Sequence, residues 1–301
     1  MTQGPELLGG RRYRITHHTT YSYDDEVTDS YGIVFSRPRD LPTQHVREHE
    51  LWTDPGHADL GEHLDSEGNL ATYFHVTEPH RRLGVSAVSV VDIAAAPVPD
   101  GAELLLWEDA RPALRVDLPE AALAMEYAVA SPLVELVDDA TRYVGESFGP
   151  GRPLVDAVLD AAGRMHHDFD YRPGSTTVAT RVREVLRARR GVCQDFAHVL
   201  IAGLRGHGLA ARYVSGYLET DPPEGQDRLV GADATHAWVQ VWMPGLGWLS
   251  VDPTNDGVTG DRHVTVAWGR DYADVPPVKG VIFTEAETSS MTVAVDVAPV
   301  V

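Results

Sequence analysis

Short runs of alternating apolar and polar residues mark the first hundred positions of the chain. These runs are rich in Tyr, Thr, Val and Ile, and clusters of turn-forming residues separate them. The pattern predicts strands over five stretches, namely 12–23, 31–35, 46–52, 71–76 and 85–93. We therefore expect an N-terminal antiparallel domain of β-sandwich-like form over residues 11–110.

The apolar spacing becomes helical in the middle of the chain. Residues 154–165 follow a helical period, and residues 178–186 follow it more loosely. One continuous apolar face is formed by Cys193, Phe196, Ala197, Leu200, Ile201 and Leu204. Gly206 and Gly208 lie where this helix should end. Residues 111–150 are expected to form a helical connection to this region.

Strand-like patterning returns after Gly208. Runs rich in Val, Tyr and Trp cover 210–218, 235–243 and 247–251, and Pro-Gly-Leu-Gly at 244–247 predicts a hairpin between the last two. A polar loop is expected at 222–230. Residues 151–301 are thus predicted to form an α+β unit, in which a helix packs on an antiparallel sheet and the C-terminal strands are included.

Composition and charge narrow the possible roles of the chain. The 301 residues carry a formal net charge of −20, which disfavours binding to nucleic acids and to anionic membranes. The first 14 residues lack the apolar stretch of a secretory signal, and no run is long enough to cross a bilayer. We therefore expect a cytoplasmic protein. The sequence does not indicate its oligomeric state.

The chain contains a single cysteine, Cys193, which excludes an intramolecular disulfide and argues against a Cys-based zinc site. A lone cysteine on an apolar helix face is most often a small core residue. Cys193, however, follows an Arg-Arg-Gly-Val segment at the expected start of a helix. The helix dipole and nearby cations favour a thiolate there. Cys193 is therefore a candidate nucleophile.

A thiol nucleophile needs a base, and the predicted hairpin supplies one. His236 opens one strand and Asp252 ends the next, so the hairpin would place them side by side if its register allows. The carboxylate could then hold the imidazole in one tautomer and stabilise the imidazolium. A helix-borne Cys with His and Asp on neighbouring strands is an acyl-transfer arrangement.

With these residues in place, the sequence resembles the transglutaminase-like superfamily. The resemblance rests on four motifs: Gly-Val-Cys-Gln-Asp-Phe-Ala-His at 191–198, Ala-Arg-Tyr-Val-Ser-Gly-Tyr at 211–217, His-Ala-Trp-Val at 236–239 and Asp-Pro-Thr-Asn at 252–255. Residues 13–23 resemble the start of the N-terminal β region in the bacterial members, and 269–272 with 277–280 resemble their closing segment.

The resemblance implies a papain-like core with Cys193 as nucleophile, His236 as base and Asp252 as the group that orients the base. It also implies attack on an amide carbonyl and a thioester intermediate. The Cys193 N–H would be one oxyanion donor, and Tyr171 is the candidate second donor, with a packed aromatic ring as the alternative. Trp238 is expected to pack behind the site or to wall the substrate groove.

Other polar residues near these motifs have plainer explanations. Asp195, in the first helical turn, could tune the site or simply offset the helix dipole. His198 lies about 140° round the helix from Cys193 and should face elsewhere. The paired histidines show no convincing metal set, so no cofactor is expected. A requirement for calcium is not decided by the sequence.

Three functions remain open. The leading hypothesis is a cysteine peptidase or amidase, or a related acyltransferase, acting on peptide or protein amides. Protein-glutamine crosslinking would use the same thioester with an amine as the acceptor, and transfer to a small amine or thiol is a further variant. The third possibility is a binding or scaffold protein on the same fold. Such a protein would be expected to lack one of the three triad residues, but this sequence contains all three.

Overall fold

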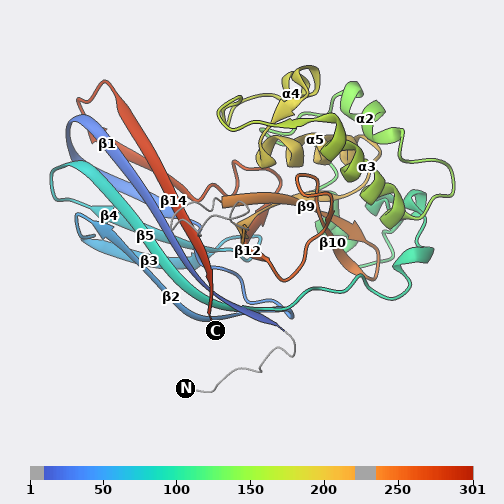
Figure 1. Cartoon of the computed structure of the whole chain (residues 1–301), viewed down its shortest axis with the longest axis horizontal. Helices are drawn as coiled ribbons and strands as arrows, with labels where there is room; N and C mark the ends of the chain where they lie inside the picture. Colours follow the sequence, from blue (N-terminus) through green and yellow to red (C-terminus); the bar gives the residue numbers. More distant parts are fainter. Residues whose placement is uncertain (1–9, 221–234, 301) are drawn as a thin grey trace, which may run out of the picture.

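The chain folds into two lobes that lie side by side (Figure 1). In the computed structural model, which describes residues 10–220 and 235–300, one lobe is a β-sheet and the other combines helices with a smaller sheet. This confirms the predicted α+β class. The polar loop expected at 222–230 lies outside the described residues.

The first lobe is built on one long strand. Its seven strands are β1 (Arg11–Val34), β2 (Gln44–Asp54), β3 (Asp59–Leu64), β4 (Leu70–Val76), β5 (His80–Ile93), β13 (Val278–Thr284) and β14 (Ser289–Pro299). The first half of β1 pairs with β5 and β14, and its second half pairs with β4 and β13. The two halves share a buried apolar cluster of Val34, Leu51, Phe74, Val76, Leu83 and Val85, which gives the lobe its sandwich-like form.

Two features of this sheet differ from the expectation. β3 was missed because all six of its residues are exposed, so its sequence shows no apolar alternation. β13 and β14 were grouped with residues 151–301, but they pair with β1 and complete the N-terminal sheet. Strand pairing across more than 240 residues of sequence leaves no local signal, so the sequence did not reveal where these two strands pair. The other domain limits stay a prediction.

The second lobe contains the predicted helices and hairpin. Its α-helices are α1 (Ala121–Met125), α2 (Asp138–Gly145), α3 (Leu154–Asp168), α4 (Val182–Ala188) and α5 (Cys193–Gly206), after three short 3-10 turns at Ala102–Leu104, Trp107–Ala110 and Pro112–Leu114. The strands are β6 (Asp170–Tyr171), β7 (Arg190–Gly191), β8 (Ala211–Leu218), β9 (Thr235–Met243), β10 (Gly247–Asp252), β11 (Gly257–Val258) and β12 (His263–Gly269). The five-stranded sheet has the order β11-β10-β9-β8-β12.

Helix α5 is the centre of this lobe. Its apolar face is buried against Ala237, Val239 and Val241 of β9 and against β8. Gly208 follows the helix with a φ of 76°, a left-handed conformation that suits glycine and ends helices. Burial of this face fixes where the helix begins, and therefore places Cys193 beside the sheet.

Two amide side chains join the lobes along β12, which is the outer strand of the five-stranded sheet. Gln44 donates to the Thr265 carbonyl and accepts from the Thr265 N–H, both at 2.8 Å. Asn69 does the same with Trp268, at 2.8 Å and 3.0 Å. Both amides are buried, so they satisfy backbone groups that an edge strand would otherwise leave open.

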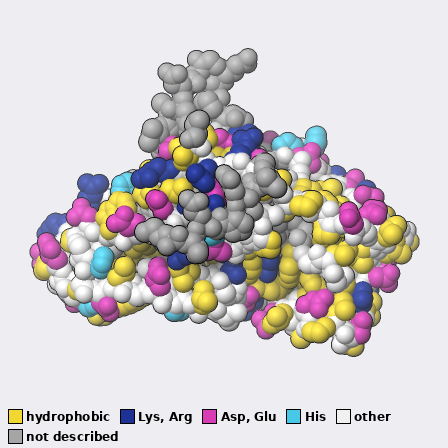
Figure 2. Space-filling model, turned by 90° about the horizontal axis from the view of Figure 1, so that it is seen from below, with side chains coloured by type: hydrophobic (Ala, Val, Ile, Leu, Met, Phe, Trp, Pro, Cys, Tyr) yellow, Lys and Arg dark blue, Asp and Glu magenta, His cyan; other side chains and the backbone are white. Residues whose placement is uncertain are grey.

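The surface carries mixed charge. On the face shown in Figure 2, Asp and Glu side chains are interspersed with arginines and apolar residues. Among the helices that the structure describes, none has the length and apolar character needed to cross a bilayer.

Candidate active site

Cys193 is the first residue of α5 and is 9% exposed. The turn before it is held by Asp195, whose Oδ2 accepts the Val192 N–H at 2.8 Å and the Thr176 hydroxyl at 2.6 Å. The Asp195 carboxylate therefore caps the N-terminus of the helix. The thiol lies at the N-terminal, positive end of the helix dipole.

His236 and Asp252 meet as the hairpin prediction required. β9 and β10 pair antiparallel with Val251 opposite Val239, and His236 Nε2 donates to Asp252 Oδ2 at 2.7 Å. Cys193 lies near enough to His236 to contribute to the raised pKa of the imidazole. Because Nε2 is taken by Asp252, Nδ1 is the ring nitrogen that remains for the thiol. The structure thus brings the three predicted residues together in the order thiol, imidazole, carboxylate.

The charges of the pair are strongly coupled. Burial alone lowers the pKa of His236, but the hydrogen bond to Asp252 and the nearby Cys193 outweigh burial and raise it to about 10. Burial likewise raises the pKa of Asp252, but hydrogen bonds from His236 and His263 outweigh it and hold that pKa well below its usual range. At neutral pH the site therefore favours an imidazolium between a carboxylate and the thiol.

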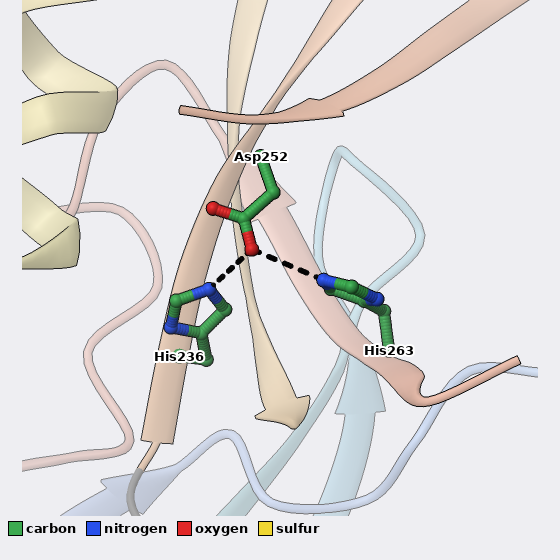
Figure 3. Close-up of side chains that lie close together, drawn as sticks. All are labelled: His236, Asp252 and His263. Atoms are coloured by element: carbon green, nitrogen blue, oxygen red, sulfur yellow. Dashed lines mark hydrogen bonds and ion pairs between the residues drawn. The ribbon is translucent and has the colours of Figure 1, made fainter. Parts of the chain in front are cut away.

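Two further residues, which sequence reasoning missed, hold the carboxylate. His263 Nε2 donates to Asp252 Oδ2 at 3.1 Å (Figure 3), and Asn255 Nδ2 donates to the same oxygen at 2.7 Å. The Gly260 N–H donates to His263 Nδ1 at 3.3 Å, so the proton of a neutral His263 must sit on Nε2. The Thr254 N–H occupies Asp252 Oδ1 at 2.8 Å. These donors keep the carboxylate ionised and fixed.

A sequence signal existed for one of these residues but not for the other. Asn255 stands three positions after Asp252, within the Asp-Pro-Thr-Asn motif, and could have been read as a turn residue that bonds back to the aspartate. His263 begins β12, which pairs with β8 and not with β10. Its approach to Asp252 depends on the path of the chain between the two strands.

Trp238 and Tyr171 have different environments. Trp238 is 1% exposed, and its ring lies 6.2 Å from the His236 ring and 5.5 Å from the His263 ring. It therefore packs behind the imidazoles. Tyr171 is half-exposed on β6, which pairs in parallel with β7 and sets Tyr171 opposite Gly191. Burial and the nearby Cys193 and Asp252 charges raise the pKa of Tyr171.

His198 faces away from the thiol, as its helical position predicted. Its ring is buried, and Nε2 accepts the Tyr272 N–H at 3.2 Å. Burial lowers the pKa of His198 to about 4, so its ring is neutral and has a structural role.

One group of potential metal ligands occurs among the described residues. His236, Asp252 and His263 each offer an atom within 4.8 Å of the others. The same three atoms are joined by the hydrogen bonds described above, so a metal ion would have to displace the ring protons that hold the triad.

Comparison with known proteins supports this reading of the fold. The family described as bacterial transglutaminase-like N-terminal region matches residues 13–92, and the transglutaminase-like superfamily matches residues 142–253. An uncharacterised protein of Mycobacterium tuberculosis is 50% identical over 97% of this chain and 94% of its own length. An uncharacterised protein of Mycobacterium leprae is 30% identical over 95% of this chain and 98% of its own length.

A solved structure has the same fold. A candidate cysteine protease from Cytophaga hutchinsonii superimposes with a TM-score of 0.75, covering 97% of this chain and 91% of the other, at 22% identity. Taken with the matched families and the residues of the site, these similarities establish that the chain belongs to the transglutaminase-like superfamily, with a bacterial transglutaminase-like N-terminal region.

Proposed function

We propose that this protein is a thiol-dependent amide hydrolase or acyltransferase that acts on peptide or protein amides through a thioester at Cys193. The observation that carries the proposal is the arrangement of His236, which lies near Cys193 and donates to the buried carboxylate of Asp252 at 2.7 Å. A scaffold protein has no need of a buried, paired imidazolium beside its single thiol.

The chemistry follows from this arrangement. The Cys193 thiolate attacks the amide carbonyl carbon, and the carbonyl π electrons move onto oxygen to form the tetrahedral oxyanion. The Cys193 N–H lies at the N-terminus of α5, where backbone donors have no partner in the helix, and it stabilises this oxyanion. His236 gives its proton to the leaving nitrogen, the C–N bond breaks, and a thioester remains. Water or an amine then attacks the thioester.

Tyr171 is the proposed second oxyanion donor. Its strand partner, Gly191, lies two residues before the nucleophile, and the charge of Cys193 contributes to the raised pKa of Tyr171. Trp238 is proposed to shield the His236–Asp252 pair, because its ring covers the imidazole from the side of the core. Shielding strengthens the ion pair by excluding water.

Hydrolysis is the proposed principal outcome, because water resolves the thioester unless the protein binds an amine specifically. Transamidation is the alternative. It is supported by 35% identity over 102 residues with a protein-glutamine gamma-glutamyltransferase of Pseudomonas aeruginosa, which spans 34% of this chain and 15% of that protein. The match covers less than the whole core and leaves the acceptor open.

The two outcomes are separated by one experiment with two readouts. Peptide amides containing glutamine are incubated with the protein and a fluorescent primary amine, and both released ammonia or amine and incorporated label are measured. We expect product from hydrolysis to exceed labelled product, and Cys193→Ala to abolish both. Amine incorporation well above hydrolysis would make the protein a transglutaminase.

The alternative that the protein is a non-catalytic scaffold is tested by alkylation of the Cys193 thiol. Iodoacetamide labelling of Cys193 is followed by intact mass across the pH range. We expect fast labelling below pH 7 that slows in His236→Ala, because the imidazolium stabilises the thiolate. An ordinary thiol profile near pH 8.5 that is unchanged in His236→Ala favours the scaffold.

A further inference from the structure

A cavity of about 230 Å³ lies between the two lobes, next to the strand that carries His236. One wall is formed by β1 and β14 of the N-terminal sheet, including Tyr21 and Val293. The other wall is formed by the catalytic lobe, including Thr235 and Tyr272. Thr235 directly precedes His236, and Figure 1 shows β9 starting on the side of the core that faces β14.

A hydrogen bond fixes the position of this cavity relative to the base. His17, on the β1 wall, is hydrogen-bonded through Nδ1 to the Tyr217 hydroxyl at 2.9 Å. Tyr217 lies opposite Thr235, and its neighbour Gly216 lies opposite His236. The N-terminal sheet is therefore anchored to β8 at Tyr217, whose strand partner Thr235 directly precedes His236.

The sheet face that lines the cavity is apolar and partly uncovered. Val295 and Val297 of β14 are fully buried in the core, whereas Met291 and Val293 continue the same face and remain 59% and 47% exposed. They lie opposite Tyr21 and Thr19 of β1. Exposed apolar side chains that line a cavity indicate a surface that something else covers.

The lining is also uncharged at neutral pH. Among the described residues that surround the cavity, none is Asp, Glu, Lys or Arg, although the chain as a whole has a net charge of −20. Burial lowers the pKa of His17 to about 4, so its ring is neutral. Burial raises the pKa of Tyr21 and Tyr272, so both phenols stay protonated. A charged group entering this space would lose hydration without a partner.

We infer that this cavity is a specificity pocket, in which the N-terminal sheet receives an uncharged, mainly apolar side chain of the amide substrate next to the amide that Cys193 attacks. Met291 and Val293 supply the apolar contact, and the Thr19 and Thr235 hydroxyls border it. The inference rests on the proposed function and gives the N-terminal region a role in substrate selection.

The test uses peptidyl acyloxymethyl ketones whose side chains next to the reactive group are Leu, Phe, Lys or Asp. Second-order rates of Cys193 modification are measured by intact mass. We expect the Leu or Phe probe to react at least about tenfold faster than the charged probes, a ratio typical of an apolar pocket. Val293→Glu should remove this preference and favour the Lys probe, which mere unfolding cannot do.

Thr292→Glu is the matched control, since its side chain lies on the same strand but on the opposite face and is absent from the cavity lining. It should keep the wild-type preference. Unchanged selectivity in a folded Val293→Glu protein overturns the pocket, as does equal reaction of all four probes with the wild type.

A second readout separates the pocket from the chemistry. Binding of the corresponding unreactive peptide amides to Cys193→Ala is measured by calorimetry, with Val293→Glu added to the same background. Loss of Leu-peptide binding on addition of Val293→Glu supports the pocket whether or not the thiol is catalytic. Binding that Val293→Glu does not alter overturns the pocket, even if the alkylation results support the proposed function.

Discussion

Replacement of Asp252 by Asn tests the central electrostatic feature of the site. His236 has a pKa of about 10 against an ordinary value of 6.5, a difference that corresponds to about 5 kcal/mol. Asp252 and Cys193 share this stabilisation of the imidazolium, and the hydrogen bond to Asp252 is its largest favourable part. If half is lost, Asp252→Asn lowers the pKa of His236 by about 2.

The variant should therefore show two linked changes. The His236 pKa, followed by NMR of the imidazole nitrogens, should fall from about 10 to about 8. The thiolate–imidazolium pair becomes about 100-fold less favourable relative to the neutral pair, so kcat/KM for an amide substrate should fall at least about 100-fold. Both changes have one cause, the loss of the carboxylate charge.

The sign of the effect on stability follows from the same shift. Because the folded-state pKa of His236 is raised, the imidazolium stabilises the fold fully below pH 6.5, and this contribution disappears as the pH rises towards 10. Urea unfolding of the wild type should thus show a free energy that declines between pH 6.5 and pH 10. In Asp252→Asn the decline should be smaller and complete at lower pH.

Asp256→Asn is the control, because it makes the same chemical change four residues away at an exposed position. Its φ of 53° is left-handed, a conformation that Asn tolerates. It should leave the His236 titration and the activity unchanged. A His236 pKa that stays near its wild-type value in Asp252→Asn would refute the assignment of Asp252 as the partner that holds the imidazolium.

Three other changes have defined outcomes. Tyr171→Phe should lower kcat about 100- to 1,000-fold if its hydroxyl serves the oxyanion, while iodoacetamide labelling, which forms no oxyanion, stays unchanged; equal kcat values would assign Tyr171 to packing alone. His263→Phe should lower kcat/KM about tenfold or more through loss of a hydrogen bond to a carboxylate, and a wild-type pH–rate profile would contradict this. Gly203→Ala should cost about 1–3 kcal/mol of unfolding free energy, because its methyl group would clash with the Val144 side chain, whereas Gly257→Ala, with open space around it, should not.

Local patterning was enough to find the helix and the hairpin that carry the proposed site. The apolar period from Cys193 to Leu204 gave α5, because burial of one helix face imposes that spacing. Pro-Gly-Leu-Gly at 244–247 gave the hairpin, in which Gly245 and Gly247 have φ values of 73° and 93°. A hairpin fixes the register of its strands, so the contact between His236 and Asp252 could be predicted from the sequence.

The residues around this pair could not be found in the same way. His263 reaches Asp252 from β12, which lies at the far edge of the sheet from β10 in strand order. β3 has no buried residue, so no periodicity marks it. Each of these features depends on how segments far apart in the sequence pack together, which the spacing of residues along the chain does not reveal.

The sequence by itself placed the helix of Cys193 and the hairpin of His236 and Asp252, and with them the proposed nucleophile, base and carboxylate, because helix periodicity and a tight hairpin are local properties. The family was indicated by the resemblance of the motifs. Only the tertiary structure decided that β13 and β14 return to β1, that Gln44 and Asn69 join the lobes, and that a neutral cavity opens beside the base. These are contacts between segments more than 190 residues apart. Their energies come from burial and hydrogen bonding that exist only once the two lobes meet.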